Sequence, residues 1–347
     1  GGIRPGCWIN ALPVGGLRVL RLTAGDAQLL QGWAEITATR AVGGIVVFTQ
    51  HSAAGDSEAA LPLTPPSAAD VTIPFDNSEG FATSFALLNA GADPLTAQLT
   101  LRDENGILLL QDSLSLAAAS RTAFSLPDQY PATLRRRGVL SLSGAAGEVA
   151  AFGLRFNPRL SFTAFQPVFT RSSGILASSI PQIADGLDWK TTILLANPGT
   201  QPVSFSLAFH QPEGGPLNLP LLGPGPRSEY TDTVPAGGLR ILQTAGSSVP
   251  LVQGSAQLVS NGPLAGAVGF RQRSPAGQDS EGALGINPAA ASRVLLPFDN
   301  VEDFQTAVAL VNDSSPGSLL ATLVLRDETG RLLGTTRRTT RLAEQLL

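Results

Sequence analysis

Short stretches of alternating apolar and polar residues recur about every ten residues along most of the chain, bounded by Gly, Pro, Asn or Asp. Alternation with period two is typical of a β-strand that buries one face. Between residues 73 and 170 the stretches are 82–89, 95–102, 107–116, 121–126, 138–143 and 149–156. Because no segment carries a convincing helical stripe, the pattern predicts an all-β fold.

Turn signals separate several of these stretches. Asn105-Gly106 and Gly214-Gly215 lie where a hairpin turn needs positive φ, which glycine adopts without steric cost. The tetrapeptides Asp103-Glu104-Asn105-Gly106 and Asp327-Glu328-Thr329-Gly330 are therefore interpreted as hairpin tips.

Four motifs return in the same order 222 to 224 residues later, which indicates an internal duplication. The matching pairs are Gly15-Gly16-Leu17-Arg18 with Gly237-Gly238-Leu239-Arg240, Gln31-Gly32 with Gln253-Gly254, Pro74-Phe75-Asp76-Asn77 with Pro297-Phe298-Asp299-Asn300, and Leu101-Arg102-Asp103-Glu104 with Leu325-Arg326-Asp327-Glu328.

A weaker repeat divides this unit again. The segments that end at Asn89, Asn197 and Asn312 match one another, so the module has about 110 residues, which suits a β-sandwich. We expect complete sandwiches at residues 70–170 and 178–288. Residues 1–62 would be the C-terminal part of a split module, and residues 293–347 the N-terminal part of one.

The middle copy carries a family resemblance. Ile180-Pro181, Asp185-Gly186, Trp189-Lys190-Thr191-Thr192 and Leu194-Leu195-Ala196-Asn197-Pro198, closing near Gly266 to Arg271, resemble the Ig-like repeats of large secreted proteins of soil bacteria. The copy at 73–170 departs from this pattern at Phe75 and Phe81. The resemblance implies tandem Ig-like (fibronectin III-like) β-sandwich modules and an extracellular or cell-surface location. It implies no catalytic motif.

The two split modules would expose unfinished sheets, since open apolar edges aggregate unless something pairs with them. Their lengths sum to one module with about ten residues of overlap. Three arrangements follow: head-to-tail completion between copies, closure of a ring within one chain, or a window cut from a longer array. The residues expected at such a self-assembly interface are Ile45, Val47, Phe48, Leu323, Leu325, Arg337, Arg338 and Arg341.

The composition of the chain limits the kinds of partner that we expect it to bind. Charged residues make up 14% of the chain and the net charge is -4, so the chain lacks the basic footprint that phosphate binding requires and no nucleic-acid partner is expected. Apolar runs stay below the roughly 18 residues needed to span a membrane. The single cysteine, Cys7, excludes an intrachain disulfide. It is interpreted as a small core or interface filler, with a free thiol that cross-links neighbouring copies as the alternative.

Few residues in the sequence are candidates for metal or ligand binding. His51 and His210 are not spaced as metal ligands. The acidic groups Asp76 with Glu79, Asp299 with Asp303, and Asp185 with Asp188 are interpreted as turn residues, with calcium binding left open. The run Arg135-Arg136-Arg137 is interpreted as a solvated loop, with binding of an anionic polysaccharide as the alternative.

Together these observations predict a non-catalytic protein without a cofactor. The first hypothesis is a structural subunit or segment of an extracellular bacterial fibre whose partners are other copies of itself, arranged head to tail. The alternative is a cell-surface adhesin stalk that binds carbohydrate or protein.

Overall fold

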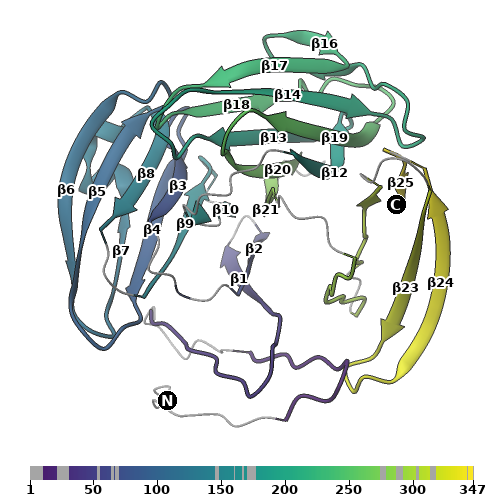
Figure 1. The fold of residues 1–347 in the computed structure, drawn as a ribbon, viewed down its shortest axis with the longest axis horizontal. Coiled ribbons are helices and arrows are strands. Elements are labelled where there is room, and N and C mark those ends of the chain that lie inside the picture. The colour runs from purple at the N-terminus through teal and green to yellow at the C-terminus, as the bar shows by residue number, and fades with distance from the viewer. Residues whose placement is uncertain are drawn as a thin grey trace.

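The computed structural model describes residues 11–21, 31–52, 55–63, 66, 70–144, 148–159, 161–165, 168–169, 177–273, 279–286, 292–301, 305–312, 318–341 and 343–346. Within these ranges the chain is nearly all β, and its sheets are antiparallel (Figure 1). The predicted all-β sandwich fold is confirmed. Cys7 lies outside the described residues.

The first complete sandwich, module 1, contains nine strands and two short helical turns. Its elements are β3 (Val71–Asp76), β4 (Ala82–Asn89), β5 (Leu95–Asp103), β6 (Leu108–Leu116), β7 (Arg121–Ser125), α1 (Leu126–Gln129), η1 (Pro131–Thr133), β8 (Arg137–Ser143), β9 (Val149–Phe156), β10 (Phe162–Phe165) and β11 (Val168–Phe169). The helical turns were not predicted.

The second complete sandwich, module 2, contains ten strands. They are β12 (Ala177–Asp185), β13 (Trp189–Ala196), β14 (Val203–His210), β15 (Leu219–Leu221), β16 (Gly225–Arg227), β17 (Glu229–Val234), β18 (Leu239–Gln243), β19 (Val252–Ser260), β20 (Ala265–Arg273) and β21 (Asp279–Gly285).

Both modules have the same strand order. Module 1 pairs β3-β8-β5-β6 in one sheet, extended by β11, and β10-β9-β4-β7 in the other. Module 2 pairs β12-β19-β14-β17 and β21-β20-β13-β18, which is the same order strand for strand. The weaker sequence repeat, with its module of about 110 residues, is therefore also a repeat of topology.

Strands outside the two modules come from the ends of the described chain. They are β1 (Ile45–Ser52), β2 (Gly55–Pro62), β22 (Leu310–Val311), β23 (Leu319–Arg326), β24 (Leu332–Thr340) and β25 (Gln345–Leu346). By the sequence repeat, β1 and β2 are equivalent to β20 and β21, whereas β22 to β25 are equivalent to β4 to β7. The pairs β1-β2, β22-β25 and β23-β24 each form a separate two-stranded sheet.

The burial pattern of a strand depends on whether one or both of its faces pack against a core. β4 and β5 alternate between buried and more exposed residues, because one face of each meets the core of module 1. β13 instead ends in the continuously buried run 193–196, and its two faces contribute to different cores. A continuous apolar run is the pattern of a strand buried on both sides.

A buried asparagine closes the second strand of each module. The Asn89 side chain donates from Nδ2 to the carbonyls of Asp93 (2.8 Å) and Ala117 (3.0 Å), and its Oδ1 accepts from Gly91 N (3.0 Å). Asn197 repeats this arrangement with Gln201 and Gly199. These bonds hold the strand ends, which would otherwise leave carbonyls buried and unpaired.

No helix within the described residues is both long and apolar enough to cross a membrane.

Replacing Asn89 tests this anchor. Asn89→Ala should lower the free energy of unfolding by about 2 to 3 kcal/mol, because the carbonyls of Asp93 and Ala117 lose buried donors. Gln98→Ala is the matched control, since Gln98 is exposed and makes one bond to the Asp112 carbonyl. Urea denaturation measures both variants, and equal losses would contradict the anchor.

Tyr130 makes module 1 sensitive to alkaline pH. Burial and the hydrogen bond to Asp112 (2.9 Å) raise the pKa of Tyr130 to about 12. The neutral phenol therefore stabilises the fold fully below the ordinary tyrosine pKa of about 10, and this contribution is lost as the pH rises towards about 12. Tyr130→Phe should flatten the loss of stability between about pH 9 and about pH 12. An unchanged alkaline slope in urea titrations would contradict this assignment.

Candidate functional site: the joints between modules

A hairpin tip of module 1 docks on a turn of module 2. The Leu239 N–H donates to the Glu104 carbonyl (3.0 Å), and Arg240 Nη1 reaches the same carbonyl at 3.4 Å. We call this contact, between residues 102–106 and 235–240, the internal joint. It lies where β5 and β18 approach each other at the upper left of Figure 1.

The hairpin tip is shaped by its own side chains. Asp103 Oδ1 accepts the N–H groups of Asn105 and Ile107, each at 2.9 Å, and Gly106 adopts φ +79°. Arg102 Nη1 donates to the Gly106 carbonyl (3.0 Å). The prediction that this tetrapeptide forms a turn is confirmed.

Glycines allow the two backbone segments of the internal joint to approach each other closely. A Cβ on Gly106 would lie 2.1 Å from the Ala236 carbonyl oxygen, and one on Gly237 would lie 2.6 Å from Cδ of Arg102. A Cβ on Gly238 would lie 2.8 Å from the Glu104 carbonyl oxygen. Side chains at these positions would push the two modules apart.

Apolar side chains fuse the two modules beneath the joint. Leu194, Ala196, Leu239 and Ala265 of module 2 belong to the same buried cluster as the core of module 1. Leu239 is 1% exposed. Since one cluster includes residues of both sandwiches, we expect modules 1 and 2 to behave as one rigid body.

A buried ion network also crosses between the modules. Arg155 of β9 donates to Asp76 Oδ2 (3.2 Å) and to Glu281 Oε2 of β21 (2.9 Å). Thr163 donates to the same Glu281 oxygen (2.8 Å), and Arg137 Nε lies 3.2 Å from Asp76 Oδ1. Arg155 also lies over the Phe81 ring, 4.3 Å from its centroid. Asp76, predicted to be a turn residue, accepts the Ser78 N–H (3.1 Å) in the turn after β3 and also pairs with Arg155. Glu281 is the anion that module 2 contributes to the network.

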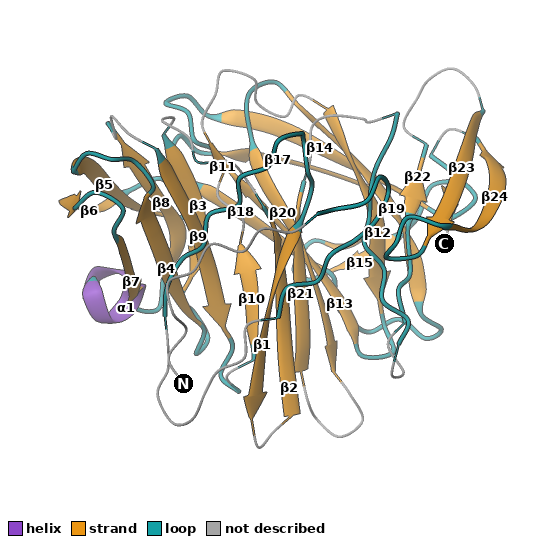
Figure 2. Cartoon of the chain, turned by 90° about the horizontal axis from the view of Figure 1, so that it is seen from below, coloured by secondary structure: helices purple, strands orange, loops and turns teal. Residues whose placement is uncertain are grey.

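The hairpin of β1 and β2 packs at this same boundary. Ala59 and Leu61 of β2 are buried against Phe162 and Ala164 of β10. Phe48 of β1 stacks on Phe152 with ring centroids 5.5 Å apart. Figure 2 shows β1 and β2 beside β10 and β21.

A second joint repeats the first at the opposite ends of the chain. The Leu17 N–H donates to the Glu328 carbonyl (3.0 Å), and Arg326 Nη1 donates to the Gly330 carbonyl (2.8 Å). A Cβ on Gly330 would lie 2.4 Å from the Val14 carbonyl oxygen. We call this contact, between residues 13–17 and 326–330, the terminal joint; it brings the N-terminal coil to the β23-β24 hairpin in Figure 1.

The terminal joint has the backbone contacts of the internal joint without its apolar support. Leu17 is 40% exposed, whereas its counterpart Leu239 is 1% exposed. Asp327 shapes the hairpin tip as Asp103 does, and the hydrogen bond from Thr329 holds the pKa of Asp327 down at about 2. The contact therefore depends mainly on hydrogen bonds.

The residues predicted for self-assembly occupy two separate places. Ile45 and Val47 are exposed on β1, and Phe48 faces Phe152. Leu323 and Leu325 are exposed on β23, and Arg337 and Arg338 are exposed on β24. Arg341 is also exposed, and its N–H donates to Glu344 (2.5 Å). Among the described strands, neither β1 nor β2 pairs with any of β22 to β25.

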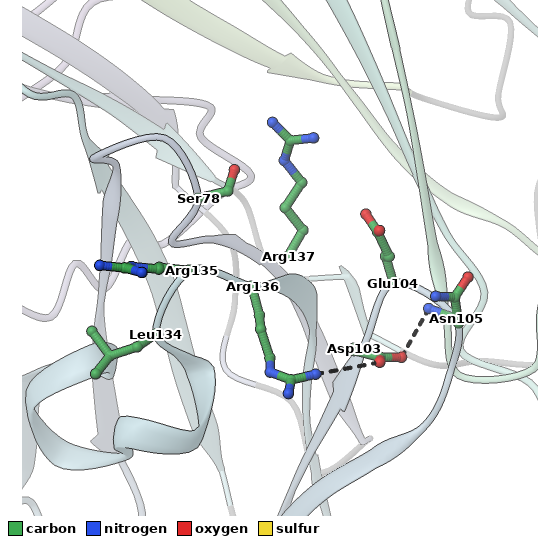
Figure 3. Close-up of a pocket in the computed structure, with 8 residues that line it drawn as sticks. All are labelled: Ser78, Asp103, Glu104, Asn105, Leu134, Arg135, Arg136 and Arg137. Atoms are coloured by element: carbon green, nitrogen blue, oxygen red, sulfur yellow. Dashed lines mark hydrogen bonds and ion pairs between the residues drawn. The ribbon is translucent and has the colours of Figure 1, made fainter.

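A polar depression of about 560 Å³ lies beside the internal joint. Its lining includes Arg135, Arg136 and Arg137 together with Asp103 and Glu104. Arg136 lies 3.8 Å from Asp103, and the three guanidinium groups point in different directions (Figure 3). They do not converge on one point, so the depression gives little support to the alternative of polysaccharide binding.

Possible metal ligands do not cluster in the part of the chain that the structure describes. No three His, Cys, Asp or Glu side chains gather there as metal ligands would. His51 lies on β1, and His210 ends β14 in module 2.

Comparison with models of protein families and with curated protein sequences finds no match for this chain.

A glycine substitution tests the internal joint. Gly144→Ala should cost about 1 kcal/mol from its positive φ alone, because no other atom lies near its Cβ position. Gly106→Ala has a similar φ but also collides with the Ala236 carbonyl, so it should separate the modules and split one thermal unfolding transition into two. Differential scanning calorimetry distinguishes the variants. A single transition in Gly106→Ala would show that the joint does not couple the modules.

Proposed function

We propose that the chain is a non-catalytic structural segment of an extracellular bacterial fibre, with other copies of itself as head-to-tail partners. The observation that carries the proposal is the internal joint, in which a shared core and buried ion pairs lock two sandwiches at one angle. A fibre needs such joints, because flexible linkers between modules would give a chain without stiffness.

Three further observations support this function. The strand order repeats from module to module, as in an array that grows by adding equal units. The joint is repeated, since residues 13–17 contact residues 326–330 as residues 235–240 contact residues 102–106. The strands β23 and β24 expose a row of apolar side chains, and soluble monomeric proteins rarely expose such a row.

The location proposed for the fibre is outside the cell. This part of the proposal depends on the resemblance to secreted Ig-like repeats and on a composition poor in charged residues.

Filament formation tests the function. We expect the 347-residue chain to form filaments in negative-stain electron microscopy and to scatter light increasingly with concentration. Leu323→Asp should block assembly, since it places a charge on the exposed face of β23, while Leu222→Asp should assemble normally. Leu222 is the matched control because it is an exposed leucine on module 2, away from β23. A chain that stays monomeric at every concentration would contradict the proposal.

A further inference from the structure

The hairpin tip of module 2 also takes part in a joint. The Gln345 N–H of β25 donates to the Pro212 carbonyl (2.8 Å), just as the turn of module 2 donates to the hairpin tip of module 1. The Gln345 side chain donates to the Pro181 carbonyl of β12 (2.7 Å), and Figure 1 shows β25 near β12. We call this contact, between residues 210–215 and 343–345, the polar joint.

Three equivalent positions differ in chemistry between the internal joint and the polar joint. They are Arg102, Val139 and Leu239 at the internal joint and His210, Ser255 and Gln345 at the polar joint. At the internal joint, Val139 and Leu239 are each 1% exposed and belong to the shared apolar cluster. Arg102 donates to the Gly106 carbonyl, so its charged group has an acceptor. The internal joint therefore combines apolar packing with a bonded charge.

The polar joint instead buries polar atoms that lack partners. Ser255 is 1% exposed and Gln345 is 6% exposed. Within the described residues, Ser255 Oγ, Gln345 Oε1 and both ring nitrogens of His210 are buried without a hydrogen-bond partner. A buried polar atom without a partner loses its bonds to water and gains none in return. The closed polar joint is therefore less stable than the internal joint, and opening it would let water reach these side chains.

The burial of His210 comes from outside the sandwich core. Phe205, Leu207 and Phe209 of β14 lie in the core of module 2. Because side chains alternate along a strand, His210 lies on the opposite face of β14. On that face the hairpin tip of module 2 meets β25. Opening the polar joint is thus the movement that would expose the imidazole.

Charged groups lie on the segments around His210, but none that the structure describes bonds to its ring. They are Glu213 in the hairpin tip, Arg227 of β16, Glu229 of β17, Asp185 of β12, and Arg341 and Glu344 beside β25. The glutamates of the tip and of β17 are exposed, whereas Asp185 and Glu344 accept other backbone N–H groups. An imidazolium in the closed joint would have two N–H donors and no acceptor.

We propose that His210 makes the polar joint a hinge that opens when its imidazole is protonated. A neutral ring can remain in the closed joint, whereas an imidazolium has to reach water, because burying an unpaired charge is far more costly than burying a neutral polar group. Histidine in water gains its charge as the pH falls through about 6.5. The closed joint is therefore favoured above this pH, and the open joint is favoured below it.

The other two joints have no such group at this position. Arg102 and Arg326 hold it there, and arginine keeps its charge throughout the range in which histidine titrates. Modules 1 and 2 would thus turn as one body against β22 to β25. The inference goes beyond fibre assembly, since the polar joint lies within one chain. A chain that stays monomeric would contradict the fibre and leave the hinge standing.

Distances between spin labels test the hinge in a Cys7→Ser background at low protein concentration. Leu222→Cys on module 2 with Leu333→Cys on β24 reports on the polar joint, and Leu222→Cys with Gln111→Cys on β6 reports on the internal joint; all three sites are exposed. From about pH 8 to about pH 5, the ratio of open to closed chains should rise for the first pair, by at most about tenfold per pH unit because one proton binds. The second distance should stay fixed. An unchanged first distance, or equal changes in both, would overturn the hinge.

Variants of His210 identify the group that takes up the proton. His210→Leu should keep the joint closed at both pH values, and His210→Gln, which also stays neutral, gives a second test if His210→Leu does not fold. Ser255→Val with Gln345→Leu copies the residues of the internal joint and should reduce opening. His51→Gln is the matched control, because His51 is the other histidine of the sequence, and it should open as the unmodified chain does. A pH response that survives without His210, or is lost without His51, would overturn the proposal.

Discussion

The close approach of a hairpin tip to a turn that contains two glycines sets how modules 1 and 2 meet. Gly237 and Gly238 have no side chains, so the backbone of Glu104 can reach Leu239 and accept its N–H. That contact fixes the angle at which the outer face of β13 meets module 1, and Leu194 and Ala196 can then join the core of module 1. At this angle Arg155 donates to Glu281.

The internal and terminal joints differ in how much apolar burial supports them. They share the same backbone bond, yet Leu239 is buried and Leu17 is not. Burying a leucine fully contributes about 1.5 to 3 kcal/mol, whereas a hydrogen bond contributes about 0.5 to 1.5 kcal/mol net. The terminal joint therefore lacks the larger part of the stabilisation that the internal joint has. A contact of this kind opens more easily. Burying the exposed face of β23 would contribute the burial free energy of several leucine side chains.

Much of the fold could be predicted from the sequence, because it depends on local patterns. The alternation in residues 82–89 and 95–102 identifies β4 and most of β5, and the spacing of Asp103 and Gly106 identifies a hairpin tip. The continuous apolar run 193–196 signals that β13 is buried on both faces, but a single sequence does not say what covers the second face.

The joint itself could not be predicted, although its residues belong to motifs that repeat in the sequence. The repeated motifs Gly-Gly-Leu-Arg and Leu-Arg-Asp-Glu are its two halves, and they contact each other across more than a hundred residues. Two segments that contact each other would recur together, as these motifs do. A simple duplication of the chain accounts for their recurrence equally well. Arg155 and Glu281 carried no signal at all, because a charged residue in a strand usually faces solvent.

The buried ion network provides orientation more than stability. Removing Arg155, Asp76 and Glu281 from water is costly, and apolar residues of similar size often serve a core as well or better. Apolar faces alone, however, tolerate sliding, whereas a charge pair is satisfied at one register. Glu58 of β2 holds the position of Glu281 in the repeat, and in this structure it is exposed and accepts a bond from Thr49. The same acidic position is thus buried at a fused boundary and solvated at an open one, so the depth of the surrounding apolar contact decides whether the charge can specify a neighbour.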